Sequence, residues 1–123
     1  MKALYPQEIE VFYLIPTIRK EFAIQFKKQQ IGQRKIAELL GVTEAAISQY
    51  INKKRASEVE LGSEVKKEIE KAAGKISNPI EAIGEVQRIL QYIKKTRLIC
   101  QYHHKFMKGI PKDCSVCFPE ENE

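Results

Sequence analysis

The chain has 123 residues, of which 43% are hydrophobic and 30% charged, and its formal net charge is +5. This length suits one compact unit with an appendage and excludes two large domains, and the composition suits a chain that can bury a core. Apolar runs are shorter than the ~20 residues that a membrane-spanning helix needs, and no signal-peptide core follows Met1, so we expect a cytoplasmic protein with no membrane partner.

Apolar residues recur at helical spacing through most of the chain, and no segment alternates as a strand would. This pattern predicts an all-α fold of about five helices. Pro6 opens the first helical segment, and Pro16 either kinks one long helix or begins a second one. The inward face of this segment consists of Ile15, Ile18, Phe22 and Phe26.

A short helix is expected from Ile31 to Leu40, with Gly41 ending it and Thr43 capping the next helix. Ala37 is small enough for a close helix crossing, and Gly41 tolerates a positive φ in the turn. Apolar residues clamp the pair from both sides, namely Ile36, Leu40, Val42, Ile47 and Tyr50. The arrangement predicts a helix-turn-helix at about residues 33–51, and the alternative is a helical hairpin without a ligand.

The outward face of the second helix carries short or amide side chains that can approach base edges in the major groove of DNA. These residues are Thr43, Glu44, Ala45, Ser48, Gln49 and Asn52. Glu44 either accepts from a cytosine amino group or is a first-turn acid that the helix dipole stabilises. Residues at the start of the first helix and after the second are expected to contact phosphates. They are Gln33, Arg34, Lys53, Lys54 and Arg55.

Positive charge gathers around this segment. Nine Lys or Arg residues and only three acids lie between Arg19 and Arg55, and a second stretch, from Lys94 to Lys112, has six cations and no acid. Such zones fit a polyanion whose condensed counterions are displaced on binding. The expected partner is therefore double-stranded DNA.

The C-terminal part is expected to hold two further helices. A linker runs from Ala56 to Gly62, Ser63 caps a helix that ends near Ala73, and Asn78 with Pro79 begins a long helix that reaches about Cys100. The long helix has a narrow apolar seam of Ile83, Val86, Leu90 and Ile93. This seam either pairs two protomers as a homodimer or packs within one chain. We expect a DNA-binding part at 1–75 and a dimerisation helix with a Cys/His segment at 76–123.

Three cysteines and two histidines lie in the last 24 residues. Cys100 and His103 are followed by Cys114 and Cys117, whose two-residue spacing is that of a metal knuckle. Three thiolates and one imidazole would complete a tetrahedral zinc site, with His104 as the competing ligand. The alternatives are an iron–sulfur cluster, a redox-switched disulfide between the last two cysteines, and thiols that bind no metal.

Several segments of the chain resemble a known family. The segments YLIPTIR at 13–19, IAELLGVT at 36–43 and AISQY at 46–50, with Lys54 and Arg55, are similar to a family of archaeal predicted transcriptional regulators with a Cro/repressor-like (XRE-like) helix-turn-helix. That family also tends to end in Cys-x-x-His followed by Cys-x-x-Cys. The resemblance implies binding to DNA as a dimer through Gln33, Glu44, Ala45 and Gln49, although a glutamine is common where Glu44 stands.

These observations predict a sequence-specific DNA-binding transcriptional regulator that acts as a homodimer. One alternative is a metal- or redox-sensing regulator whose C-terminal site controls DNA binding, and another is an antitoxin-like adaptor that binds a protein. An enzyme is not expected, because the sequence has no nucleophile–base pair, paired carboxylates or phosphate-binding glycine loop. No small-molecule substrate is expected either.

Overall fold

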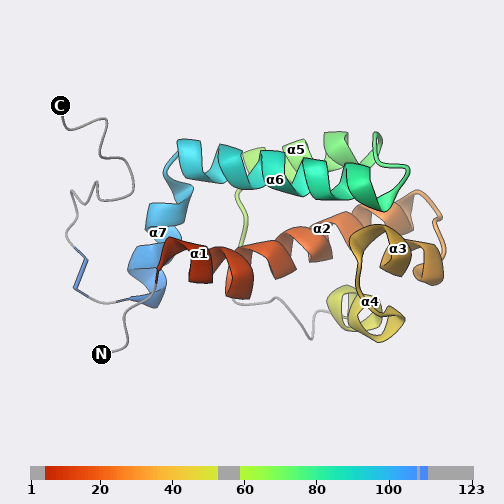
Figure 1. Cartoon of the computed structure of the whole chain (residues 1–123), viewed down its shortest axis with the longest axis horizontal. Coiled ribbons are helices and arrows are strands. Elements are labelled where there is room, and N and C mark those ends of the chain that lie inside the picture. The colour runs from red at the N-terminus through yellow and green to blue at the C-terminus, as the bar shows by residue number, and fades with distance from the viewer. Residues whose placement is uncertain (1–4, 53–58, 108, 111–123) are drawn as a thin grey trace.

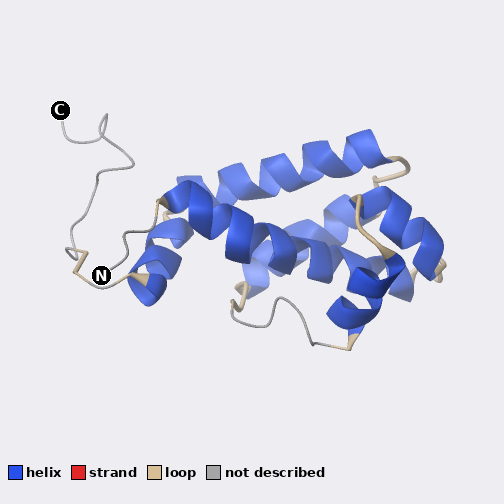
Figure 2. Cartoon of the chain, turned by 60° about the horizontal axis from the view of Figure 1, so that its bottom comes forward, coloured by secondary structure: helices blue, strands red, loops and turns tan. Residues whose placement is uncertain are grey.

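The computed structural model describes residues 5–52, 59–107 and 109–110. Within these ranges the chain forms helices and connecting loops without a strand (Figures 1 and 2), as the all-α prediction requires. The elements are α1 (Pro6–Ile9), a π-helical segment η1 (Glu10–Leu14), α2 (Ile15–Lys28), α3 (Gln33–Leu40), α4 (Glu44–Ile51), α5 (Ser63–Ala73), α6 (Pro79–Lys95) and α7 (Leu98–Phe106). Because α1, η1 and α2 are continuous, these ranges hold six helices, close to the five expected. None of them is long and apolar enough to cross a membrane.

Helix α2 lies at the centre of the molecule. Helices α5 and α6 form a layer along one side of it, α3 and α4 lie at one end, and α7 lies at the other end beside α1 (Figure 1). Ile18, Phe22 and Phe26 of α2 are fully buried, and the two phenylalanine rings stack with their centroids 6.0 Å apart. They belong to one core that extends from Ile9 to Ile99 and so includes residues on both sides of position 75.

Pro16 is accommodated by the π-helical segment that precedes it. A proline inside a helix removes one N–H donor and crowds the preceding turn. Here Ile15 donates its N–H to the carbonyl of Glu10, five residues back, and the helix continues as α2. The hydroxyl of buried Thr17 donates to the carbonyl of Tyr13 at 2.6 Å. The wider turn therefore lets α1 and α2 form one helical run instead of two separate helices.

Two helix ends share one hydrogen-bonding pattern. Gly41 has φ +67, its N–H donates to Glu38, and the N–H of Val42 donates to Ala37. This is a Schellman motif, which satisfies the last carbonyls of α3. Gln30 plays the same part after α2 with φ +64, as its N–H donates to Lys27 and that of Ile31 to Phe26. The turn at Gln30 and the extended N-cap Gly32 make α3 begin at Gln33, so the predicted start at Ile31 was wrong.

The predicted start of α6 is confirmed, with one difference in its cap. Asn78 Oδ1 accepts from the N–H of Glu81 at 2.9 Å, and Pro79 is the first helical residue. The Glu81 carboxylate accepts from the hydroxyl and the N–H of Ser77, one residue before the position that a capping box uses. These hydrogen bonds lower the pKa of Glu81.

Helix α6 ends earlier than the sequence suggested. The predicted run to Cys100 was wrong, because Arg97 adopts φ +63 and separates α6 from α7. The Thr96 hydroxyl donates to the carbonyls of Tyr92 and Ile93 at this break. A left-handed residue here turns the chain so that α7 can pack on both α6 and α1.

Two further predictions for the C-terminal part need correction. Ser63 does not cap α5, because Gly62 is the N-cap residue and no side chain caps the helix. The seam of α6 is divided, since Leu90 and Ile93 are buried in the core of the same chain, while Val86 is half-buried and Ile83 is exposed. The intramolecular alternative therefore holds for the second half of the seam.

Replacing Gly41 with alanine is expected to lower the free energy of unfolding by about 1 kcal/mol, because an L side chain is strained at positive φ. Gly84 provides the matched control. It is exposed in the interior of α6, and an added Cβ would meet nothing within 4 Å, so Gly84→Ala should raise stability by about 0.5–1 kcal/mol. Urea denaturation measures both changes, and shifts of the same sign would contradict the assigned turn.

Candidate nucleic-acid interface

Helices α3 and α4 are joined by only three residues and held together at both ends. At the turn, Thr43 Oγ1 accepts from the N–H of Ala46 at 3.1 Å and so caps α4, as predicted. At the start of α3, the Gln33 side-chain amide donates to the backbone carbonyl of Glu44 at 2.8 Å. The first residues of the two helices are thus linked directly, and α4 is fixed relative to α3.

The two faces of α4 differ in chemistry. Ala46, Ile47 and Tyr50 are buried against α2 and α3, and Ile36, Leu40 and the small Ala37 of α3 are buried as well. The opposite face is polar and open to solvent. On it, Thr43, Glu44, Ala45, Gln49 and Asn52 are exposed and Ser48 is partly exposed. The structure therefore brings these six predicted residues to the surface side of α4.

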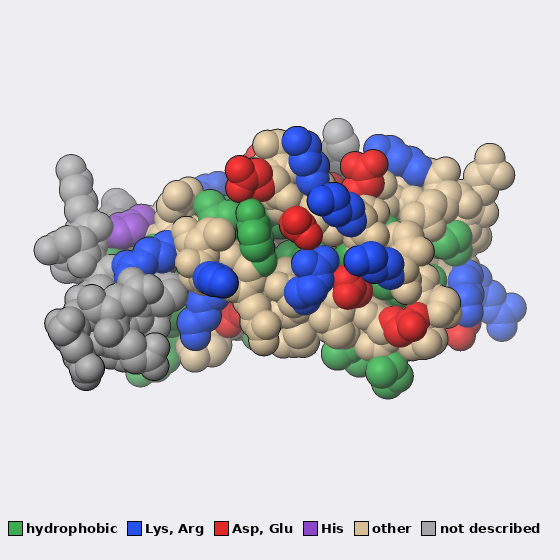
Figure 3. Space-filling view, turned by 90° about the horizontal axis from the view of Figure 1, so that it is seen from above, with side chains coloured by type: hydrophobic (Ala, Val, Ile, Leu, Met, Phe, Trp, Pro, Cys, Tyr) green, Lys and Arg blue, Asp and Glu red, His purple; other side chains and the backbone are tan. Residues whose placement is uncertain are grey.

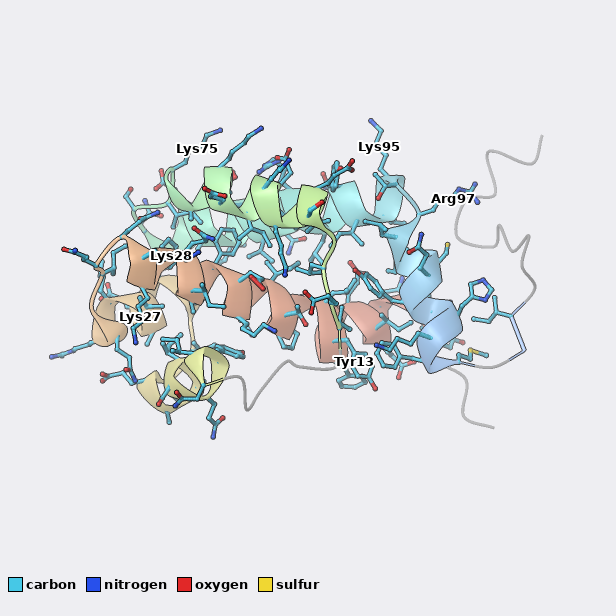
Figure 4. The ribbon with its side chains drawn as sticks, turned by 180° about the vertical axis from the view of Figure 1, so that it is seen from behind. Tyr13, Lys27, Lys28, Lys75, Lys95 and Arg97 are labelled. Carbon is cyan, nitrogen blue, oxygen red and sulfur yellow. The ribbon has the colours of Figure 1, made fainter. Side chains whose placement is uncertain are left out.

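Cations border this surface. Arg34 is exposed in the first turn of α3, and Lys27 and Lys28 are exposed in the last turn of α2, near α3 and α4 (Figure 4). None of these three side chains has an ion-pair or hydrogen-bond partner among residues 5–52, 59–107 and 109–110. Lys95 and Arg97, from the second cationic stretch, lie at the far end of the molecule from α4 (Figure 4). Of these five described cations, the three from the first stretch therefore border the candidate interface and the two from the second do not.

The face formed by α5 and α6 is electrostatically different. Positive and negative side chains are interspersed over it (Figure 3), and Arg88 pairs with both Glu68 and Glu85 at 3.2 Å. Lys66 pairs with Glu60 at 2.7 Å, and this hydrogen bond raises the pKa of Lys66. Acids thus lie among the cations of this face and pair with Lys66 and Arg88, so it offers a weaker site for a polyanion.

The predicted metal ligands are only partly described. Cys100 and His103 lie three residues apart on α7, which places both on one side of that helix, and both are partly buried, whereas His104 is exposed. A thiolate and an imidazole so spaced are compatible with one zinc ion. No third histidine, cysteine or acid joins them within the described part of the chain. Cys114 and Cys117 lie outside that part, as do the predicted phosphate contacts Lys53, Lys54 and Arg55.

Sequence reasoning did not include Lys27 and Lys28 among the site residues. They are among the nine Lys and Arg residues between Arg19 and Arg55, but no motif distinguishes them. Their position in the last turn before the helix pair was the available signal, since the end of a preceding helix must lie close to the pair that it leads into.

Comparisons with known proteins give no match to this chain, whether with protein-family models, curated proteins or solved structures.

Proposed function

We propose that this protein is a sequence-specific DNA-binding transcriptional regulator that uses α3 and α4 as a helix-turn-helix. The observation that carries the proposal is the two-faced α4, which is clamped on its inner side and presents small and amide side chains on its outer side. The resemblance of residues 8–55 to XRE-like regulators supports the same function. The cations beside α3 and α4 add the electrostatic attraction that DNA binding requires.

In this mechanism, phosphate contacts position the protein and base contacts select the sequence. Arg34, Lys53, Lys54 and Arg55 neutralise phosphates and set the register of α4. Gln49 and Asn52 can pair with adenine through their amides, and Ala45 can contact a thymine methyl group. Glu44 stands in the first turn of α4, where it can accept from a cytosine amino group.

Replacing Gln49 with alanine should relax the preference at one base-pair position by about 1–3 kcal/mol, because a bidentate contact to a base edge is lost. The measurement is selection of bound fragments from random DNA, followed by competition with single-base variants of the selected operator. Gln91→Ala, which removes an exposed glutamine from α6, is the matched control. Equal discrimination by wild type and Gln49→Ala would contradict the placement of α4 in the groove.

The proposed regulator acts as a homodimer, and α6 provides the contact. Ile80 and Ile83 project from the first half of α6 with 76% and 59% of their surfaces exposed. Beside them a cleft of about 220 Å³ opens between α2, α3 and α6, with mainly apolar walls that include Leu39, Ala82 and Val86. A two-fold contact joins a patch to its own copy, so a patch with both a projecting side chain and a hollow can fill itself. The occupant proposed for the cleft is therefore a second copy of the chain.

Wild-type protein is expected to have twice the monomer mass of 14.2 kDa at micromolar concentration. Ile83→Asp should give monomers, because it replaces the projecting apolar side chain with a hydrated carboxylate, whose burial against the mainly apolar walls is costly. Val11→Asp is the control, since Val11 is also an exposed aliphatic residue, at 56%, but lies outside the cleft. Light scattering gives both masses. A monomeric wild type, or a dimeric Ile83→Asp, would rule out this contact.

Zinc is the proposed cofactor. Cys100 and His103 would hold the ion together with Cys114 and Cys117, and the bound ion would cross-link the end of the chain to α7. Helix α7 is itself well anchored. The Phe106 ring stacks on Tyr13 with a 3.9 Å centroid distance, and the Tyr102 hydroxyl donates to the carbonyl of Glu60 at 3.2 Å.

These contacts favour a second candidate function, in which the metal site regulates DNA binding. Tyr13 belongs to the helical run that becomes α2, and Glu60 belongs to the segment that follows α4 and leads into α5. A change in the position of α7 would therefore affect the segments that precede and follow the helix pair of α3 and α4 in the chain. Under this alternative, operator affinity changes when the metal is removed, whereas under the first it does not.

The purified protein is expected to contain one equivalent of zinc, and Cys100→Ser and His103→Gln should each reduce it strongly, because each removes one of four ligands. His104→Gln should retain the metal and serves as control for its neighbour. Elemental analysis measures the metal, and operator titrations with and without a chelator separate the two functions. A brown protein would indicate an iron–sulfur cluster instead, and neither metal after anaerobic purification would refute the site.

A further inference from the structure

A second surface near α4 has the chemistry of a binding site, and none of the residues to which a phosphate or base contact was assigned above belongs to it. An open cleft of about 390 Å³ lies between the last turns of α2 and α4. Ile24 and Ile51, both partly buried, form its apolar lining, and Lys27 and Lys28 supply its charge. Among the residues that the structure describes, no carboxylate lines it.

This combination indicates the kind of ligand. The two ammonium groups of this described lining favour an anion, and the two isoleucines favour a ligand whose anionic group adjoins an apolar face. A DNA strand has this chemistry, because charged phosphates alternate with deoxyribose rings that can pack on aliphatic side chains. Ile51 ends α4, directly before exposed Asn52, so a duplex that receives α4 in its major groove would bring a bordering strand to this cleft.

We infer that the cleft between the ends of α2 and α4 binds the sugar–phosphate backbone of the duplex, with Lys27 and Lys28 on phosphates and Ile24 and Ile51 against a deoxyribose. The inference rests on the proposed function. It adds a contact to the DNA backbone in which α2, a helix outside the α3–α4 pair, supplies the two lysines. Cations in the last turn of α2 also suit the helix dipole, so the test must separate binding from stabilisation of α2.

The chain offers a closely matched control. Lys94 and Lys95 are likewise two adjacent, exposed lysines in the last turn of a helix, but Lys95 lies at the opposite end of the molecule (Figure 4). The double variants Lys27→Gln/Lys28→Gln and Lys94→Gln/Lys95→Gln therefore lose the same charge and the same dipole interaction. They differ in whether the missing lysines border α4.

The measurement is the affinity of each variant for the selected operator over a range of salt concentrations. Each phosphate contact contributes about −0.9 to the slope of log K against log salt, so Lys27→Gln/Lys28→Gln should flatten the slope by about 2 and bind tens of times more weakly at about 0.1 M salt. Lys94→Gln/Lys95→Gln should keep the wild-type slope. Lys27→Arg/Lys28→Arg should restore binding, because arginine also contacts phosphate.

Ethylation interference then locates the contact. Phosphates whose ethylation weakens the wild-type complex, but not the Lys27→Gln/Lys28→Gln complex, are those held in the cleft. If wild type binds its operator and both double variants give its slope and its interference pattern, this inference is wrong while the proposed function stands. If wild type selects no DNA sequence, the proposed function fails and the inference fails with it.

Discussion

The burial of one face of α2 is the constraint on which the remaining structure depends. Four helices, α3 to α6, pack against this helix, and Phe22 and Phe26 fill the space between them. Truncating such a buried ring commonly costs about 3–5 kcal/mol, which is a large part of the ~5–15 kcal/mol that stabilises a typical domain. Helix α4 has only eight residues, too few to be stable alone in water. It exists because its inner face completes the core around α2.

The dependence of the helices on packing also explains which of their ends can be predicted from the sequence. Thr43 and the Asn78–Pro79 pair act within one helical turn of themselves, so their residue types carry the signal, and the structure confirms both starts. Gly41 also marks its own turn. The left-handed residues Gln30 and Arg97 carry no such signal, because neither side chain favours positive φ. Packing of the following helix imposes these two turns, and a distant cause of this kind cannot be detected in a local window.

The candidate interface could likewise be predicted only where its signal is local in the sequence. Periodicity places Gln49 and Asn52 opposite Ile47 and Tyr50, and the exposure of these residues agrees with that placement. Periodicity contains no information about which other helix borders this surface. Lys27 and Lys28 are more than 20 residues from Ile51 in sequence, and only the folded chain brings them to one cleft. The divided seam of α6 has the same origin, since the helices that contact α6, namely α2, α3, α5 and α7, determine which of its turns are covered.

Gln33 shows how positioning and recognition can be coupled in one side chain. Its amide nitrogen carries two protons, and one is donated to the carbonyl of Glu44. In the proposed complex with DNA, the second proton would be donated to a phosphate at the start of α3, where unpaired backbone N–H groups also favour an anion. A phosphate held there would be bound by a group that is itself attached to the first residue of α4. Contact with the DNA backbone would then set the depth of α4 in the groove, and the proposed base contacts of Ala45 and Gln49 would depend on a residue that touches no base.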